Sequence, residues 1–219
     1  MSGLIAIPNM GTVPVAFMQS FCHMMTQFHK VGNPATMWIN YFWVHLAREM
    51  AAKKCMDDGC EWLLFLDSDM VFPPETIEKL LSHNLPIVSG LCFKRQWPPR
   101  PTLYRALDAN MDNIANLSSW EPLQKIDAAG CACLLIRREV FEKIPEPWFA
   151  LNEWGAAEDI SFFCRVKKAG IDAYADTTVK CGHVGLHEFG EEDFNRAMQI
   201  GAFEKIEQQA DNTGKITQL

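Results

Sequence analysis

One continuous apolar run of strand length in this chain ends in two carboxylates. The run is Trp62–Leu66, and Asp67-Ser68-Asp69 follows it directly. Apolar runs without polar alternation are typical of strands buried on both faces of a sheet. The run therefore predicts an α/β fold, in which a mostly parallel sheet lies between helices. Ligands of such sheets bind beyond the carboxyl ends of the strands, which is where both acids stand.

Asp67 and Asp69 are two residues apart, so in an extended segment both side chains would point the same way and approach one cation. Two hard oxygen ligands suit Mg²⁺ or Mn²⁺ held together with a substrate diphosphate. A polar turn that caps the following helix, which Pro73-Pro74 would begin, accounts for the same residues. The pair alone does not separate these two interpretations.

The rest of the chain alternates strand-like and helix-like segments, as expected for a single α/β domain. Residues 94–125 are rich in Pro, Asn and Asp and predict a long irregular segment with a weak strand near 102–104. Gly59 is expected to end the second helix in a left-handed cap. Strands are predicted near 4–7, 86–90, 124–128, 131–136, 172–174 and 178–183, and helices near 17–28, 40–56, 75–81, 158–168 and 191–209.

Composition excludes several classes of protein. The net charge is −7 and no basic tract occurs, which argues against nucleic-acid binding. No apolar run approaches the ~20 residues of a membrane helix, and the N-terminus lacks the basic region of a secretory signal. The eight cysteines form no C-x-x-C pairs, so reduced thiols are expected rather than disulfides or a zinc site. We therefore expect a cytoplasmic protein without a transmembrane segment.

Three further segments carry side chains that suit a catalytic site. Glu158 and Asp159 begin a predicted helix, where the helix dipole stabilises carboxylates; a simple capping role accounts for them equally well. His183 lies between two glycines just after a predicted strand, although an isolated histidine is often structural. Arg48 lies on the second predicted helix, where it could equally be a surface charge.

Together, these pieces resemble glycosyltransferases of the GT-A fold, most closely the compact, single-domain, family 2-like enzymes of phages and bacteria. The resemblance covers residues 4–185, and it depends on the order of the motifs more than on any one of them. The matching segments are Ile5-Ala-Ile-Pro8, Leu46-Ala-Arg48, Phe65-Leu-Asp-Ser-Asp-Met70, Val88-Ser-Gly90, Asp127-Ala-Ala-Gly130, Trp154-Gly-Ala-Ala-Glu-Asp159 and Cys181-Gly-His183.

The resemblance implies a metal-dependent transfer of a sugar from a nucleotide-sugar, with a UDP-sugar as the default donor. It implies that Asp69 and His183 hold Mn²⁺ or Mg²⁺ and that Asp67 lies near the ribose or the metal. In inverting members the second acid of the Glu-Asp pair is the general base, which assigns that role to Asp159, with Glu158 orienting the acceptor or the base.

The same resemblance suggests where the donor and acceptor bind. Pro8 and Asn9 would hold the nucleobase, Arg48 would approach the nucleotide, and Lys94 and Arg95 are candidates for diphosphate contacts. Trp154 would either stack on a sugar or fill the core. A domain of residues 1–187 would divide into a nucleotide-binding half (1–93) and an acceptor-binding half (94–187), followed by a helical tail (188–219). The acceptor would be a glycan, a lipid-linked sugar or another hydroxyl compound.

Other functions remain open at this stage. A nucleotidyltransferase of similar fold would favour a Gly-rich, basic loop after the first strand, but Asn9-Met-Gly-Thr12 has one glycine and no Lys or Arg. A non-catalytic nucleotide- or sugar-binding module needs no base, so the presence of both acid pairs argues against it. A zinc protein is disfavoured by the irregular spacing of the cysteines.

Overall fold

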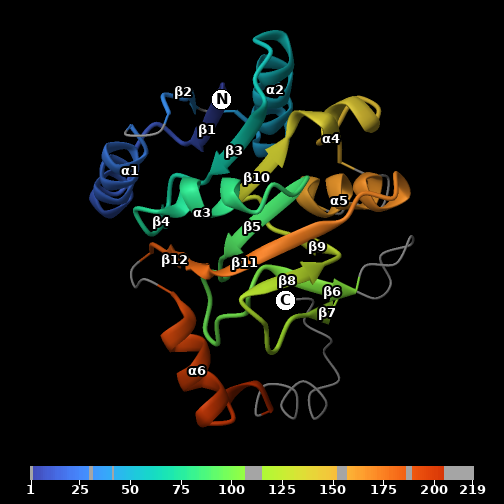
Figure 1. Cartoon of the computed structure of the whole chain (residues 1–219). Coiled ribbons are helices and arrows are strands. Elements are labelled where there is room, and N and C mark those ends of the chain that lie inside the picture. The colour runs from blue at the N-terminus through green and yellow to red at the C-terminus, as the bar shows by residue number, and fades with distance from the viewer. Residues whose placement is uncertain are drawn as a thin grey trace.

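The computed structural model describes residues 2–29, 32–40, 42–106, 115–151, 157–185 and 189–204. A seven-stranded sheet lies at its centre, with the strand order β2-β1-β3-β10-β5-β11-β8 (Figure 1). These strands are β1 (Gly3–Asn9), β2 (Ala35–Asn40), β3 (Trp62–Leu66), β5 (Ile87–Leu91), β8 (Leu123–Ile126), β10 (Cys133–Arg137) and β11 (Ala173–Lys180).

The sheet is mixed but mostly parallel, as predicted. β1 is parallel to β2 and to β3, and β5 is parallel to β11. β10 lies between β3 and β5 and is antiparallel to both, so those two strands run in the same direction. β8 is antiparallel to β11 at one edge. The carboxyl ends of β1, β2, β3, β5 and β11 therefore meet at one edge of the sheet, which is the arrangement of the GT-A type fold.

Helices cover both faces of the sheet, also as predicted (Figure 1). The strand β3 shows why: all five of its side chains are fully buried, and they alternate between two cores. Leu63 and Phe65 pack in one core with α2, α4 and α5, whereas Leu64 packs in the other with α1 and α3. The helices are α1 (Val15–Phe28), α2 (Val44–Asp57), α3 (Thr76–Ser82), α4 (Arg138–Lys143), α5 (Glu158–Lys168) and α6 (Glu191–Gln199).

Two small sheets adjoin the carboxyl edge of the main one. In the first, β4 (Met70–Val71) pairs with β12 (Gly182–His183). The second has the order β7-β6-β9, with β6 (Leu103–Ala106), β7 (Ala115–Asn116) and β9 (Ala128–Ala129). The segment predicted to be irregular thus contributes β6 and β7 to an ordered sheet.

The structure corrects several element predictions. The strand β2 was not predicted, because as an edge strand it exposes most of its side chains and lacks clean alternation. The helix expected from residue 40 begins at Val44, and the six-residue helix α4 was missed. Gly59 does adopt the left-handed conformation, with φ of +68°. The tail helix α6 ends at Gln199, and residues 205–219 lie outside the described part. None of the described helices has the length and apolar character needed to span a membrane.

Candidate functional site

The two acids that follow β3 lie in a turn. The backbone N–H of Met70 donates to the carbonyl oxygen of Asp67 at 3.1 Å, which closes the turn. The expectation that Asp67 and Asp69 stand on an extended segment and point the same way is therefore wrong. The turn gives the two carboxylates different partners: Asp69 contacts His183, and Asp67 contacts Arg48.

Pairing of β4 with β12 brings His183 beside Asp69. His183 is opposite Met70 in the register, and the N–H of Val184 donates to the Asp69 carbonyl at 2.7 Å. The His183 Nε2 atom then lies 3.0 Å from Asp69 Oδ2, and its Nδ1 atom lies 3.0 Å from the Phe93 carbonyl oxygen. A carbonyl oxygen only accepts hydrogen bonds, so Nδ1 carries a proton and Nε2 is directed at the carboxylate.

The Asp69–His183 contact shifts the pKa of both partners. Burial acts to raise the pKa of Asp69, but the bond and the charge of His183 outweigh it, so the pKa of Asp69 is lowered. Burial acts to lower the pKa of His183, and the bond to Asp69 reverses this, so the pKa of His183 is raised. Both shifts favour an ion pair between Asp69 and His183.

Arg95 also contacts Asp69. Its Nη1 atom lies 3.2 Å from Asp69 Oδ2 and 3.4 Å from the carbonyl oxygen of Val184, and about half of its side chain is exposed. The described contacts of Lys94 are backbone ones: its N–H donates to the Arg100 carbonyl at 2.9 Å, and its carbonyl accepts the N–H of Gln96 at 2.9 Å. Of the two predicted diphosphate contacts, the structure therefore places Arg95 against the aspartate.

Arg48 contacts acids from two separate parts of the site, and it does so from inside the protein. Only 3% of this residue is exposed, so the alternative of a surface charge is wrong. Its Nε donates to Glu158 Oε1 at 2.9 Å, and its Nη2 lies 3.1 Å from Asp67 Oδ1 and 3.3 Å from Oδ2. The guanidinium also lies 5.3 Å from the centre of the Phe65 ring. Arg48 thus binds two acids, and its expected approach to the nucleotide remains a prediction.

Asp159 lies in the first turn of α5, beside the Arg48–Glu158 pair. Its Oδ1 accepts the N–H of Ile160 at 2.7 Å. Burial, and next the neighbouring charge of Glu158, raise the pKa of Asp159 to about 6. A carboxylate with a pKa closer to neutrality is a better proton acceptor, so Asp159 has the character expected of a general base.

Asn9 closes the loop that follows β1. Its Oδ1 accepts the N–H of Gly11 at 2.8 Å, and its Nδ2 donates to the carbonyls of Ile7 at 3.3 Å and Ile39 at 3.5 Å. Pro8 precedes it at the carboxyl end of the strand, on the same edge of the sheet as the acids. Asn9 therefore shapes this loop, and the nucleobase contact of Pro8 and Asn9 remains a prediction.

The donor set suits a divalent cation that shares its ligands with a substrate. The described residues include no cluster of three or more His, Cys, Asp or Glu side chains placed to hold a metal by themselves. Asp69 and His183 nevertheless converge to 3.0 Å. Mg²⁺ sites commonly use one or two protein ligands together with water and substrate phosphates. The pair fits such a cation, while Asp67 is engaged by Arg48.

One neighbour of Asp159, Tyr104 on β6, was not predicted from the sequence. Burial, and then the charge of Asp159, raise the pKa of Tyr104 to about 12, so this phenol lies within electrostatic reach of the acid. Gly130 also lies close to Asp159, because a Cβ atom added to this glycine would stand 3.7 Å from Asp159 Oδ2. The segment Asp127–Gly130 did stand out in the sequence, but nothing in it indicated Tyr104 as a neighbour. Trp154 lies outside the described residues.

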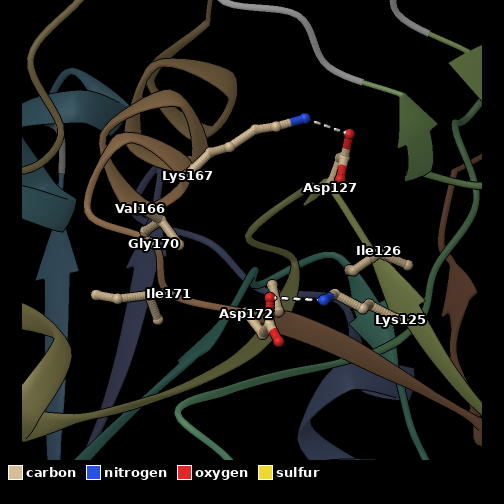
Figure 2. A pocket seen from close by; sticks show the side chains of 9 residues that line it. Lys125, Ile126, Asp127, Val166, Lys167, Gly170, Ile171 and Asp172 are labelled. Atoms are coloured by element: carbon tan, nitrogen blue, oxygen red, sulfur yellow. Dashed lines mark hydrogen bonds and ion pairs between the residues drawn. The ribbon is translucent and has the colours of Figure 1, made fainter.

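A separate pocket of 220 Å³ lies between β8 and the end of α5 (Figure 2). Two ion pairs of 2.7 Å flank it, Lys167 with Asp127 and Lys125 with Asp172. The helix α5 begins at Glu158 and Asp159 and ends at this pocket. The length of the helix therefore separates the pocket from the two acids by about 15 Å. The pocket is therefore not part of the candidate site.

Comparison with known proteins supports the fold. No protein-family model matches the chain, and no curated protein matches it in sequence. The structure of A197 from STIV has a TM-score of 0.60 and 22% identity, covering 84% of this chain and 86% of A197. TarS residues 1–349 from S. aureus has a TM-score of 0.44 and 15% identity, covering 93% of this chain and 65% of that one. The same TarS in complex with UDP has a TM-score of 0.43 and 14% identity, covering 81% and 60%. At these identities, the likeness to A197 shows the fold alone, and the TarS scores are too low to add to the argument.

Proposed function

We propose that this protein is a metal-dependent, inverting glycosyltransferase that moves a sugar from a nucleotide-sugar to an acceptor hydroxyl. One observation carries the proposal: Arg48 joins the turn that holds the Asp69–His183 pair to the start of α5, where Asp159 lies. It binds Asp67, two residues from the Asp69–His183 pair, and it binds Glu158, which precedes Asp159. A cation site beside a proton acceptor is what displacement of a nucleoside diphosphate by a hydroxyl requires.

Asp69 and His183 would hold Mn²⁺ or Mg²⁺, with Asp67 near the ribose or the metal. When bound, the cation neutralises the charge that develops on the departing diphosphate. The Phe93 carbonyl supports this role, because it fixes the His183 ring with Nε2 directed at Asp69. Arg95 is positioned to turn from Asp69 to the diphosphate, and Pro8, Asn9 and Lys94 remain the candidates for the other donor contacts.

Asp159 would accept the proton of the acceptor hydroxyl. Its raised pKa of about 6 leaves it ionised at neutral pH but basic enough to bind that proton. Glu158 is held by Arg48 and is 7% exposed, which supports a role in orienting the base rather than a direct part in proton transfer. The acceptor would be a glycan, a lipid-linked sugar or another hydroxyl compound, and a UDP-sugar is the donor to test first.

A panel of sugar nucleotides with Mn²⁺ tests the proposal. We expect slow, metal-dependent release of a nucleoside diphosphate from one donor, because glycosyltransferase sites slowly hydrolyse the donor when water takes the place of the acceptor. The variant Asp69→Ala should lose metal-dependent nucleotide binding, whereas Asp159→Asn should keep binding and lose transfer. Release of pyrophosphate from a nucleoside triphosphate and a sugar phosphate would select a nucleotidyltransferase instead. Binding without any turnover would indicate a binding module.

A further inference from the structure

The central sheet ends in two edge strands of different character. β8 forms one edge, and it contains Lys125 and follows Pro122 directly. Lysine and proline are residues with which proteins block further pairing at a sheet edge. β2 forms the other edge, and its sequence, Ala35-Thr-Met-Trp-Ile-Asn40, contains neither proline nor any charged residue. β2 therefore lacks the features that keep an edge strand from pairing with another chain.

The backbone of β2 is paired along one side. Its neighbour in the described sheet is β1, in a parallel register that runs from Leu4 opposite Ala35 to Asn9 opposite Asn40. The side of an edge strand that faces away from its neighbour presents a row of backbone N–H and C=O groups, which are a template for a further strand. Four of the six β2 residues are also exposed. This edge is thus suited to accept a strand.

Exposed apolar side chains lie close to this edge in the chain. Trp38, in the middle of β2, is 40% exposed although it packs against α1. α2 begins four residues after β2 ends, and Trp43, Leu46 and Met50 at its start are also exposed, Trp43 by 77%. These three positions are three and four residues apart, so they form one stripe on the helix. Apolar surface gathered in this way marks an interaction site.

We propose that two copies of this chain associate through β2, with the two strands paired antiparallel about a two-fold axis. The second copy supplies the same edge, so the surface is complementary to itself and the assembly closes as a dimer. Each chain carries a net charge of −7, but β2 carries none, so like charges do not meet along the paired strands. A lipid bilayer fits this edge less well, because hydrocarbon offers no partner for backbone N–H and C=O groups. The inference does not depend on the proposed function.

Sedimentation velocity over a wide range of protein concentrations tests the dimer. The wild type should reach twice the 24.9 kDa mass of the chain. Thr36→Lys places a charge at an exposed position of β2 and should raise the Kd of the dimer by about tenfold or more. The matched control is Ser119→Lys, because Ser119 is exposed and lies between β7 and β8, before the strand at the opposite edge of the sheet. The control should dimerise like the wild type.

Hydrogen exchange of the wild type tests the strand pairing without any variant, and it decides if Thr36→Lys does not fold. The amides of residues 35–40 should exchange more slowly at concentrations that favour the dimer than after dilution. A wild type that stays monomeric would overturn the inference, and a monomer that sediments with phosphatidylcholine vesicles would assign the surface to a membrane instead. A dimer that Thr36→Lys leaves unchanged, or one in which these amides gain no protection, would overturn pairing through β2.

Discussion

Replacing Arg48 with Met should destabilise the protein strongly. The Arg48 and Glu158 side chains are 4% and 9% exposed, so the substitution leaves the carboxylate of Glu158 buried without its cation. Breaking a buried ion pair in this way costs about 3–5 kcal/mol. Asp67 is 29% exposed, and solvent screening makes its share smaller. Since domains of this kind are stable by about 5–15 kcal/mol, the variant should lose a large part of its free energy of unfolding.

Urea unfolding followed by circular dichroism measures this loss. The matched control is Arg105→Met, because the Arg105 side chain is exposed and the change should stay within about 0.5 kcal/mol. The double variant Arg48→Met with Glu158→Gln removes the unpaired charge as well. It should recover about 1–3 kcal/mol relative to Arg48→Met alone. A loss below about 1 kcal/mol for Arg48→Met, with no recovery in the double variant, would refute the buried network.

Three other predictions concern pH and packing. The transfer rate should fall as pH drops below about 6, because Asp159 with a pKa of about 6 must be ionised to accept a proton; a rate that is flat from pH 5 to 8 would contradict this. Burial raises the pKa of Asp176, but hydrogen bonds from Thr178 and His83 outweigh it, so the folded pKa is lowered. The resulting stabilisation is present above the unfolded pKa of about 4 and is lost as pH falls through the folded pKa. Asp176→Asn should therefore reduce the loss of thermal stability at acid pH, measured by thermal melts. An unchanged loss in the variant would exclude Asp176 as its source. Phe65→Ala, at a fully buried position of β3, should cost about 3–5 kcal/mol in urea unfolding, and a cost near that of a surface substitution would show that the core is not packed as described.

The parts of the fold that carry strong local signals were predictable from sequence. The strand β3 is apolar at every position because both of its faces are covered, and a short apolar run between turn residues is typical of such a strand. β2 was not predicted because its position at the edge of the sheet leaves most of its side chains exposed, so its sequence lacks a regular alternation of apolar and polar residues. Short elements such as α4 likewise carry too few residues for a periodic signal.

The residue types of the site were predictable, but not the contacts between them. The order of the motifs suggested that Asp69 and His183 belong to one site, and the structure places them 3.0 Å apart. The bond from Arg48 to Glu158 spans 110 residues and depends on how α2 and α5 pack, which no local pattern encodes. Tyr104 reaches the site through a weakly patterned strand, so only the tertiary structure reveals it.

The most direct test of the metal-dependent mechanism is the position of Mn²⁺ in crystals grown with the nucleoside diphosphate that the donor panel identifies. Anomalous scattering locates the ion without assumptions about the ligand. We predict an ion within about 2.5 Å of Asp69 Oδ2 and His183 Nε2, in contact with the diphosphate, and its loss in Asp69→Ala. An ion bound elsewhere, or bound equally well by Asp69→Ala, would contradict the mechanism.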